Sequence, residues 1–431
     1  MKKIIFIILF MCFLGVEHTS SQDVLTFHKA VKLAFENNHQ IKVAYNNKLI
    51  AENNAHPGNA GLLPDLNITG NINQQNTSGL SMGSDGTISN LSAKMQASYT
   101  LFDGFGNIYR LKKLNKESEI STYNTRSLIE QTLLRVSSAY YNLASAEENL
   151  RISRELLSIS RERLDRIKKR SQFGQSSKVQ VLAAQVDFNN DSITVVIVQL
   201  RFEEAKRNLN ALLNLEIDTD YTVDPEIEFT NIPELSELKQ TARENNAAYQ
   251  SAKTALKKAQ LNKSIISSFQ FPQIDLSASY GYTGTGSDIK DAYQDPNKSW
   301  TIGASLMFPL FNGFQTQIQR QNAEIGIKNS KLQKNEQELT LKKELINSFE
   351  AYKNSRKILE LNQQNLQAAQ LNFKRTAELF YLGQVTNTQF REAQLNLIRA
   401  KNSITEAKYT AKLDELVLLQ ITGQLISFVE E

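Results

Sequence analysis

The sequence predicts an α+β fold in which long antiparallel helical hairpins and four membrane-type β-strands are laid out twice along one chain. Three observations lead to this prediction. The two halves of the chain repeat one another at an offset of 208 to 209 residues, apolar residues recur every seventh position over long stretches, and four short stretches alternate between apolar and polar residues.

The first residues, "MKKIIFIILFMCFLGVEHTSSQ", have the lysines, the apolar run and the small polar residues of a secretory signal peptide. We expect residues 1–21 to be this leader, with cleavage before Gln22. Cys12 is the only cysteine and lies inside the leader, after Phe10 and Met11, an order that disfavours acylation. The mature chain is therefore expected to form no disulfides and no thiolate metal site. A net charge of +4 over 431 residues argues against nucleic acid as a partner.

The repeat divides the chain into parts of similar order. "AFENNHQIKVA" from Ala34 matches "ARENNAAYQSA" from Ala242, and "LFDGF" matches "LFNGF". The expected parts are a first repeat over 22–215, an acidic linker over 216–233, a second repeat over 234–423 and a tail over 424–431. The linker either packs as an extended segment outside the main body or is simply flexible.

Each half contains one very long predicted helix. From Ile129 to Leu164, and again from Leu345 to Phe380, an apolar residue recurs every seventh position, which is typical of helices that supercoil against neighbours. In the first half this helix covers 107–172, about 99 Å at 1.5 Å per residue. Shorter helices over 25–55 and 176–214 have nearly the same combined length and are expected to run antiparallel beside it.

Four stretches change from the helical period to a period of two. We expect strands at about 65–76, 91–102, 273–283 and 299–311, each with one apolar and one polar face. This pattern fits the lipid-facing strands of an outer-membrane barrel, although a soluble antiparallel sheet alternates in the same way. Four strands cannot close a barrel, so the strands must be shared between copies: two copies would supply eight strands and three would supply twelve.

Taken in order, these parts resemble the TolC family of outer-membrane efflux and secretion channels. The resemblance covers nearly the whole mature chain and includes "LFDGF", "LFNGF" and the turns "FGQSSKVQVLAAQ" and "YLGQVTNTQFREAQ". It implies a homotrimer with a twelve-stranded barrel in the outer membrane and a helical tunnel in the periplasm. It also implies a periplasmic adaptor and an inner-membrane efflux or ABC transporter as partners, outer-membrane lipid around the barrel, no cofactor and no enzymatic activity.

The resemblance assigns two sets of residues. The hairpin tips, expected to form the periplasmic aperture and to dock the adaptor, are Gly174, Gln175, Ser176, Gly383, Gln384 and Val385. The second set lies at the corners between strand and helix, where Asp or Asn is expected to cap the helix and Gly to allow the turn. Phe is expected to lie at the lipid interface or against a neighbouring strand. The corner residues are Phe102, Asp103, Gly104, Phe105, Phe311, Asn312, Gly313 and Phe314.

At the aperture the sequence departs from well-known family members. Gln389 stands where they carry a ring-forming aspartate, and Val385 stands where they carry a basic residue. Glu392 keeps a carboxylate three residues further on, so it is either part of a threefold acidic ring or an ordinary surface charge. These differences put a salt-bridged lock and a cation-binding ring in doubt.

Other functions fit the sequence less well. The four histidines, His18, His28, His39 and His56, all lie near the N-terminus without metal-ligand spacing, and no catalytic constellation is present. The alternative is a periplasmic coiled-coil adaptor or structural protein, but an adaptor is expected to have one hairpin between β-rich domains. Cargo stays open among drugs, metal ions and secreted polypeptides.

Overall fold

The computed structural model describes residues 24–77 and 86–430. The predicted leader with Cys12 and His18 lies outside the described residues, as does the loop segment 78–85. The chain divides into two compact units. The helical unit contains the residues up to Glu36 together with Val136–Glu228 and Asn365–Tyr409, and the strand unit contains Asn37–Arg135, Phe229–Gln364 and the residues from Thr410 onward.

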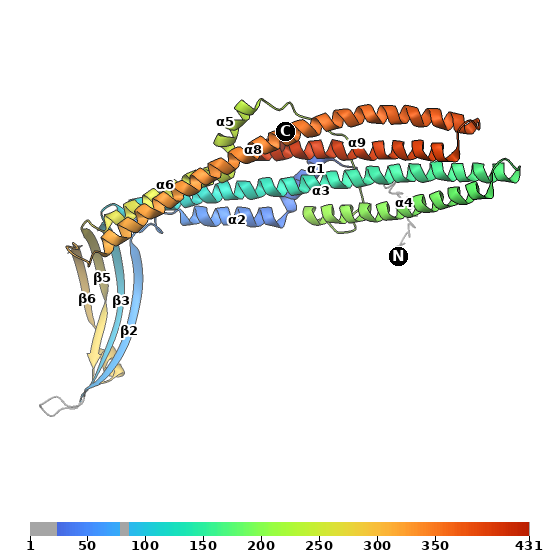
Figure 1. Ribbon diagram of the computed structural model, residues 1–431. Coiled ribbons are helices and arrows are strands. Elements are labelled where there is room, and N and C mark those ends of the chain that lie inside the picture. The colour runs from blue at the N-terminus through green and yellow to red at the C-terminus, as the bar shows by residue number, and fades with distance from the viewer. Residues whose placement is uncertain (1–23, 78–85, 431) are drawn as a thin grey trace, which may run out of the picture. The chain divides into compact units, whose positions relative to one another are not determined.

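Two helical hairpins make up most of the helical unit. The long helices α3 (Gly106–Gln172) and α8 (Gln315–Tyr381) end in this unit, and each is followed by a returning helix, α4 (Lys178–Leu213) or α9 (Asn387–Ile421). Figure 1 shows each helix lying beside its antiparallel partner. A short parallel pair, β1 (Val24–Leu25) with β4 (Thr222–Val223), also belongs to this unit.

The heptad positions predicted from the sequence form the buried seam of these helices. Val136, Leu143 and Leu150 on α3 are at most 4% exposed, and Phe380 on α8 is 3% exposed. A neighbouring cluster joins Ile152 and Leu156 to Ile398 on α9. The returning helix is therefore held by apolar burial along its length, as expected for amphipathic helices too polar to be stable alone.

The linker after α4 is packed where it belongs to the helical unit. Tyr221 and Val223 are buried, at 5% and 6% exposed. Asn210 donates to the carbonyl oxygens of Ile217 and Thr219 at 2.9 and 3.0 Å, and the Tyr221 hydroxyl donates to Asn210 Oδ1 at 2.7 Å. This arrangement favours the packed segment over the flexible linker.

The strand unit contains a four-stranded antiparallel sheet in the order β2-β3-β5-β6. The strands are β2 (Asp65–Thr77), β3 (Gly86–Phe102), β5 (Gln273–Gly286) and β6 (Asn297–Met307). β3 begins five residues before the expected start because residues 86–90 continue the backbone ladder with β2 whatever their side chains. β6 ends four residues before the expected end, just ahead of Pro309, whose ring nitrogen cannot donate to a ladder.

The remaining helices differ from the prediction in one place. The single helix expected over 25–55 is two helices, α1 (Phe27–Asn37) and α2 (His39–Asn54), because Asn38 adopts an extended backbone and its side chain caps α2. The others are α5 (Leu235–Asn245), α6 (Ala247–Ser268), α7 (Ile289–Gln294) and α10 (Leu425–Glu430). Among the described residues, no helix combines the length and the apolar character needed to cross a membrane.

Candidate functional site: hairpin tips and strand-to-helix corners

The two predicted hairpin tips have the same backbone. Gly174 and Gly383 both have positive φ, 71° and 79°, which favours glycine. The N–H of Gln175 bonds to the carbonyl of Arg170 at 2.9 Å, and that of Gln384 bonds to the carbonyl of Leu379 at the same distance. Each long helix therefore ends in the glycine-terminated turn typical of helix C-termini, which explains the repeated Gly-Gln pair.

The returning helices also begin in the same way. Ser177 accepts from the N–H of Gln180, whose side chain bonds back to the N–H of Ser177, and Thr386 and Gln389 repeat this reciprocal pair. Gln389 Oε1 lies 2.9 Å from the Thr386 nitrogen. Gln389 thus forms a capping box with Thr386, which the spacing of Thr and Gln in the sequence also indicates.

Val385 at the second tip lies at the edge of an apolar core. It is half-buried and packs against the cluster formed by Leu164, Ile167, Ala184, Phe380 and Phe390. The Phe380 and Phe390 rings are 4.6 Å apart. A basic residue at position 385 would place its charge against this apolar cluster, so valine is explained by packing.

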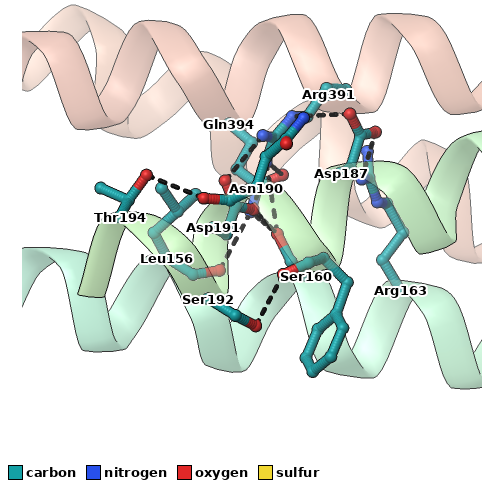
Figure 2. Close-up of polar contacts among 11 residues, drawn as sticks. Leu156, Ser160, Arg163, Asp187, Asn190, Asp191, Ser192, Thr194, Arg391 and Gln394 are labelled. Carbon is teal, nitrogen blue, oxygen red and sulfur yellow. Dashed lines mark hydrogen bonds and ion pairs between the residues drawn. The ribbon is translucent and has the colours of Figure 1, made fainter. Parts of the chain in front are cut away.

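Next to this core, a buried ionic network joins three helices, and no sequence pattern predicted it (Figure 2). Arg391 on α9 donates two hydrogen bonds, of 2.7 and 2.8 Å, to the carboxylate of Asp191 on α4. The hydroxyl of Ser160 on α3 donates to the same carboxylate. Gln394 donates to Ser160 Oγ at 3.1 Å and to the carbonyl of Leu156 at 3.4 Å.

The centre of the network is buried, whereas its Asp187 end is partly exposed. Ser160 and Gln394 are fully buried, and Asp191 is 4% exposed. A second pair, Arg163 to Asp187 at 2.6 Å, extends it, and Arg391 Nε lies 3.8 Å from Asp187. Such a network gives strong positional specificity, because removing one member leaves a buried charge without its partner.

Burial lowers the pKa of Arg163, and the Asp187 carboxylate opposes this effect. The Arg163 Nε and Nη1 atoms are buried and have no hydrogen-bond partner among the described residues. The side chain stays charged at any physiological pH, because arginine starts from a very high pKa. The cost of its burial makes Asp187 the essential counter-charge.

None of the network's charged residues recurs in the other half of the chain. At the same offset of 209 residues, Arg163 matches Asn372, Asp191 matches Ala400, and Leu182 matches Arg391. The helix seams of the two halves therefore differ in polarity although their backbones match. The sequence alone does not indicate the network, since each of its charged residues resembles an ordinary surface charge.

The two tips also differ in charge. Residues 161–178 carry seven Lys or Arg and two Asp or Glu, a net charge of +5, whereas the matching residues 370–387 carry two and one, a net charge of +1. Phe173 at the first tip is 80% exposed, and Leu382 at the second is 72% exposed. Glu392 lies at the start of α9, one residue after the network's Arg391. The first tip thus combines an exposed aromatic ring with a basic surround.

At each corner the chain turns through two consecutive residues with positive φ. Gly104 and Phe105 have φ of 69° and 67°, and Gly313 and Phe314 have φ of 65° and 64°. The sequence indicates the glycines but not the phenylalanines, for which this conformation is strained. Each strained ring packs edge-on against an earlier one, Phe102 with Phe105 at 5.4 Å and Phe311 with Phe314 at 5.3 Å.

The two corners use different hydrogen bonds, which corrects the expectation that both begin their helix with a side-chain cap. Asp103 Oδ2 accepts from the N–H of Asn107 at 2.7 Å, as a cap does. The amide of Asn312 instead donates to the hydroxyl of Thr316 at 2.6 Å. Thr316 stands where the first half has Asn107, and its hydroxyl supplies an acceptor, whereas the Asn107 amide donates to the carbonyl of Gly61.

Comparison with known proteins identifies the family that has this architecture. The sequence profile of the family described as "Outer membrane efflux protein" matches residues 30–215 and 238–424. The chain belongs to the outer membrane efflux protein family. The matched ranges cover most of both repeats, so the resemblance seen in the sequence is confirmed.

Individual members of this family align over most of the chain. The cation efflux system protein CusC of Escherichia coli O157:H7 is 21% identical over 397 residues, covering 90% of this chain and 84% of CusC. The toluene efflux pump outer membrane protein TtgC of Pseudomonas putida is 22% identical over 370 residues, covering 84% of this chain and 76% of TtgC.

Solved structures share the fold. A crystal structure of CusC superposes with a TM-score of 0.78 at 19% identity, covering 92% of both chains. The outer membrane protein VceC of Vibrio cholerae gives 0.76 at 17% identity, covering 92% of this chain and 96% of VceC. The predicted α+β fold of long helical hairpins with a β-barrel part, in two repeats, is thereby confirmed.

Proposed function

We propose that three copies of this outer membrane efflux family member form the exit duct of a tripartite efflux pump, which passively exports substrates delivered by an inner-membrane transporter through a periplasmic adaptor. The observation that carries this proposal is the open sheet. β2 and β6 form its two edges, with 13 and 11 residues, and leave long rows of backbone groups without a partner strand among the described residues.

The side chains on the sheet favour lipid around it. Trp300, Ile302 and Leu306 on β6 and Ile68 on β2 are between 69 and 78% exposed, all on the apolar face. An open edge cannot persist in lipid, because unpaired backbone groups there cost several kcal/mol each. Pairing β6 of one copy with β2 of the next removes every edge, and three copies give twelve strands with room for a passage.

Exposed apolar stripes on two helices also favour contacts between copies. α4 exposes an apolar stripe at heptad-like spacing, formed by Val179, Leu182, Val186, Ile193, Val196, Ile197 and Leu200. On α8, Ile318, Ile325, Leu332 and Leu339 recur every seventh position and are 53 to 69% exposed. Stripes of this kind are the seams of supercoiled helices, so we assign them to contacts with neighbouring copies.

The hairpin tips are the proposed docking surface for the adaptor. The first tip offers Phe173 as an apolar anchor inside a basic surround, which suits a partner with an apolar pocket rimmed by carboxylates. The second tip lacks the basic surround, so we propose that the first contributes more of the binding energy. At the aperture, Glu392 is the candidate for a threefold carboxylate ring, since Gln389 is engaged in its capping box.

Efflux is favoured over polypeptide secretion by the names of the relatives, which describe cation, antibiotic and toluene efflux. The cargo of this chain is proposed only as small solutes.

The test combines fractionation with crosslinking. We expect the protein to require detergent for extraction from outer membranes and to crosslink as a trimer after extraction. Deletion should raise sensitivity to a subset of a panel of toxic compounds. Release without detergent would support the alternative, a periplasmic coiled-coil adaptor, and a stable monomer in detergent would exclude the shared barrel.

A further inference from the structure

The short helix α7 lies on the apolar face of the sheet, at the end far from the helix corners. A Cβ atom at Gly284 would lie 1.6 Å from the carbonyl oxygen of Ala292 in α7. A Cβ atom at Gly286 would lie 2.6 Å from the backbone nitrogen of Ala292. In the strand register these glycines pair with Leu91 and Ser89 of β3. Directly paired residues share a face, so α7 covers the face that carries Leu91.

Burial gives the same placement independently. Ser89 is 1% exposed although it lies near the end of β3, and Ala292, which faces it from α7, is also 1% exposed. Ser89 lies two residues before Leu91, on the face that carries the apolar residues of β3. Among the described residues, α7 packs mainly on the central strands β3 and β5, so it leaves both sheet edges free for neighbouring copies.

The distance from the corner to α7 matches the thickness of a membrane. On β3 the apolar face runs from Leu101, beside the corner, to Leu91, where α7 begins to cover it: ten residue steps, or about 33 Å along the strand. A strand tilted by about 40° spans roughly 25 Å of bilayer over that length, the height of the apolar band of outer-membrane barrels. α7 begins to cover the face where this band ends.

We propose that α7 is an interfacial anchor that lies against the lipid headgroups of the outer leaflet and fixes the outer limit of the lipid-facing band. This inference rests on the proposed function, because it requires the sheet to be in the membrane. Glycines at 284 and 286 are explained by the close approach of the helix, which any side chain would prevent.

The exposed side chains of α7 suit this position. Tyr293 is 74% exposed and Ile289 is 45% exposed, while Lys290 lies opposite the buried Ala292 on the helix. On the neighbouring β6, the Lys298 ammonium lies 5.8 Å from the centre of the Tyr282 ring. Aromatic rings with lysines beside them are the typical composition of a membrane interface.

Depth-dependent quenching tests the placement. The only cysteine of the chain lies in the predicted leader, so Tyr293→Cys in the mature trimer gives one labelling site per chain for a fluorophore. The probes are phosphatidylcholine–phosphatidylglycerol vesicles that carry a nitroxide either on the headgroup or near the end of the acyl chain. Ile302→Cys in the middle of the apolar face and Gln96→Cys on the polar face are the matched controls.

We expect the label at position 293 to be quenched several-fold more by the headgroup nitroxide than by the deep one. The label at 302 should show the reverse order, and the label at 96 should respond to neither. Adding Gly284→Ala should displace α7 and abolish headgroup quenching at 293 while leaving quenching at 302 unchanged. If 302 is quenched by the deep nitroxide and 293 by neither, the anchor is refuted and the barrel stands. If 302 is not quenched either, the proposed membrane function fails with it.

Discussion

The buried pair of Arg391 and Asp191 makes a quantitative prediction about how firmly α9 is held. Replacing Arg391 with alanine leaves the Asp191 carboxylate, 4% exposed, with the Ser160 hydroxyl but without its bidentate partner. Breaking a buried pair in this way costs about 3–5 kcal/mol. The Arg391 side chain is 15% exposed, so we take the lower figure of about 3 kcal/mol.

The assay is hydrogen exchange of the detergent-solubilised trimer, followed by mass spectrometry of peptides from the first turns of α9. A loss of about 3 kcal/mol in local opening free energy accelerates exchange there by about 100-fold. Arg399→Ala is the matched control, because Arg399 lies on the same helix, is exposed and bonds within α9, to Asn396 at 3.3 Å. It should leave exchange nearly unchanged.

A second variant separates the pair from simple loss of packing. In Arg391→Ala with Asp191→Ala, no buried carboxylate is left unpaired at this position, so exchange should be slower than in Arg391→Ala alone. Equal exchange in Arg391→Ala and Arg399→Ala would refute the reasoning, because it would mean that desolvation cancels the attraction and that the carboxylate is tolerated alone.

Three further predictions concern other parts of the chain. Gly104→Ala should lower the melting temperature of the trimer far more than Gly313→Ala. A Cβ at position 104 would lie 2.6 Å from a backbone oxygen, whereas at position 313 only the backbone strain of about 1–2 kcal/mol applies. Equal shifts in melting temperature for the two variants would contradict this prediction. Burial raises the pKa of Glu130, so the native state binds more protons than the unfolded state. The stability of the wild type relative to Glu130→Gln should therefore rise as pH falls from neutral toward the ordinary glutamate range. Thermal melts of both proteins at several pH values check this dependence, and a difference in stability that does not change with pH would exclude it. Phe173→Ala should reduce adaptor capture on a biosensor surface more than Leu382→Ala, its repeat equivalent, and the reverse order would remove the first tip from its proposed role.

Most of the fold could be predicted from the sequence because its elements are long and strictly periodic. The heptads ending at Leu164 and Phe380 indicate the seam, and the alternation in β3 and β5 indicates the sheet. The break between α1 and α2 was missed because the apolar period continues across Asn38, whose capping role depends on a single backbone angle. The strain at Phe105 and Phe314 was missed because phenylalanine gives no local signal for positive φ.

The candidate site was less predictable for a related reason. The tip glycines follow from turn chemistry, and the Thr386–Gln389 capping box follows from residue spacing. The ionic network requires knowledge of which helix faces meet, because Ser160 and Asp191 are 31 positions apart and Arg391 lies 200 positions beyond Asp191. Heptad analysis gives the seam positions but not the pairing between hairpins.

The difference between the two halves is a consequence of placing two copies of one backbone in a single chain. A repeated backbone gives each hairpin the same turns and caps, since these depend on local φ and on nearest neighbours. Charge is not constrained in this way, because a tip in water tolerates either sign, and a seam tolerates a buried pair once both partners are present. The repeat therefore leaves the charges free to diverge, and here they have diverged at the tips and in the helix seam. If three such chains form one duct, its periplasmic end presents two alternating kinds of tip, and a partner that distinguishes them binds at three positions more strongly than at the other three.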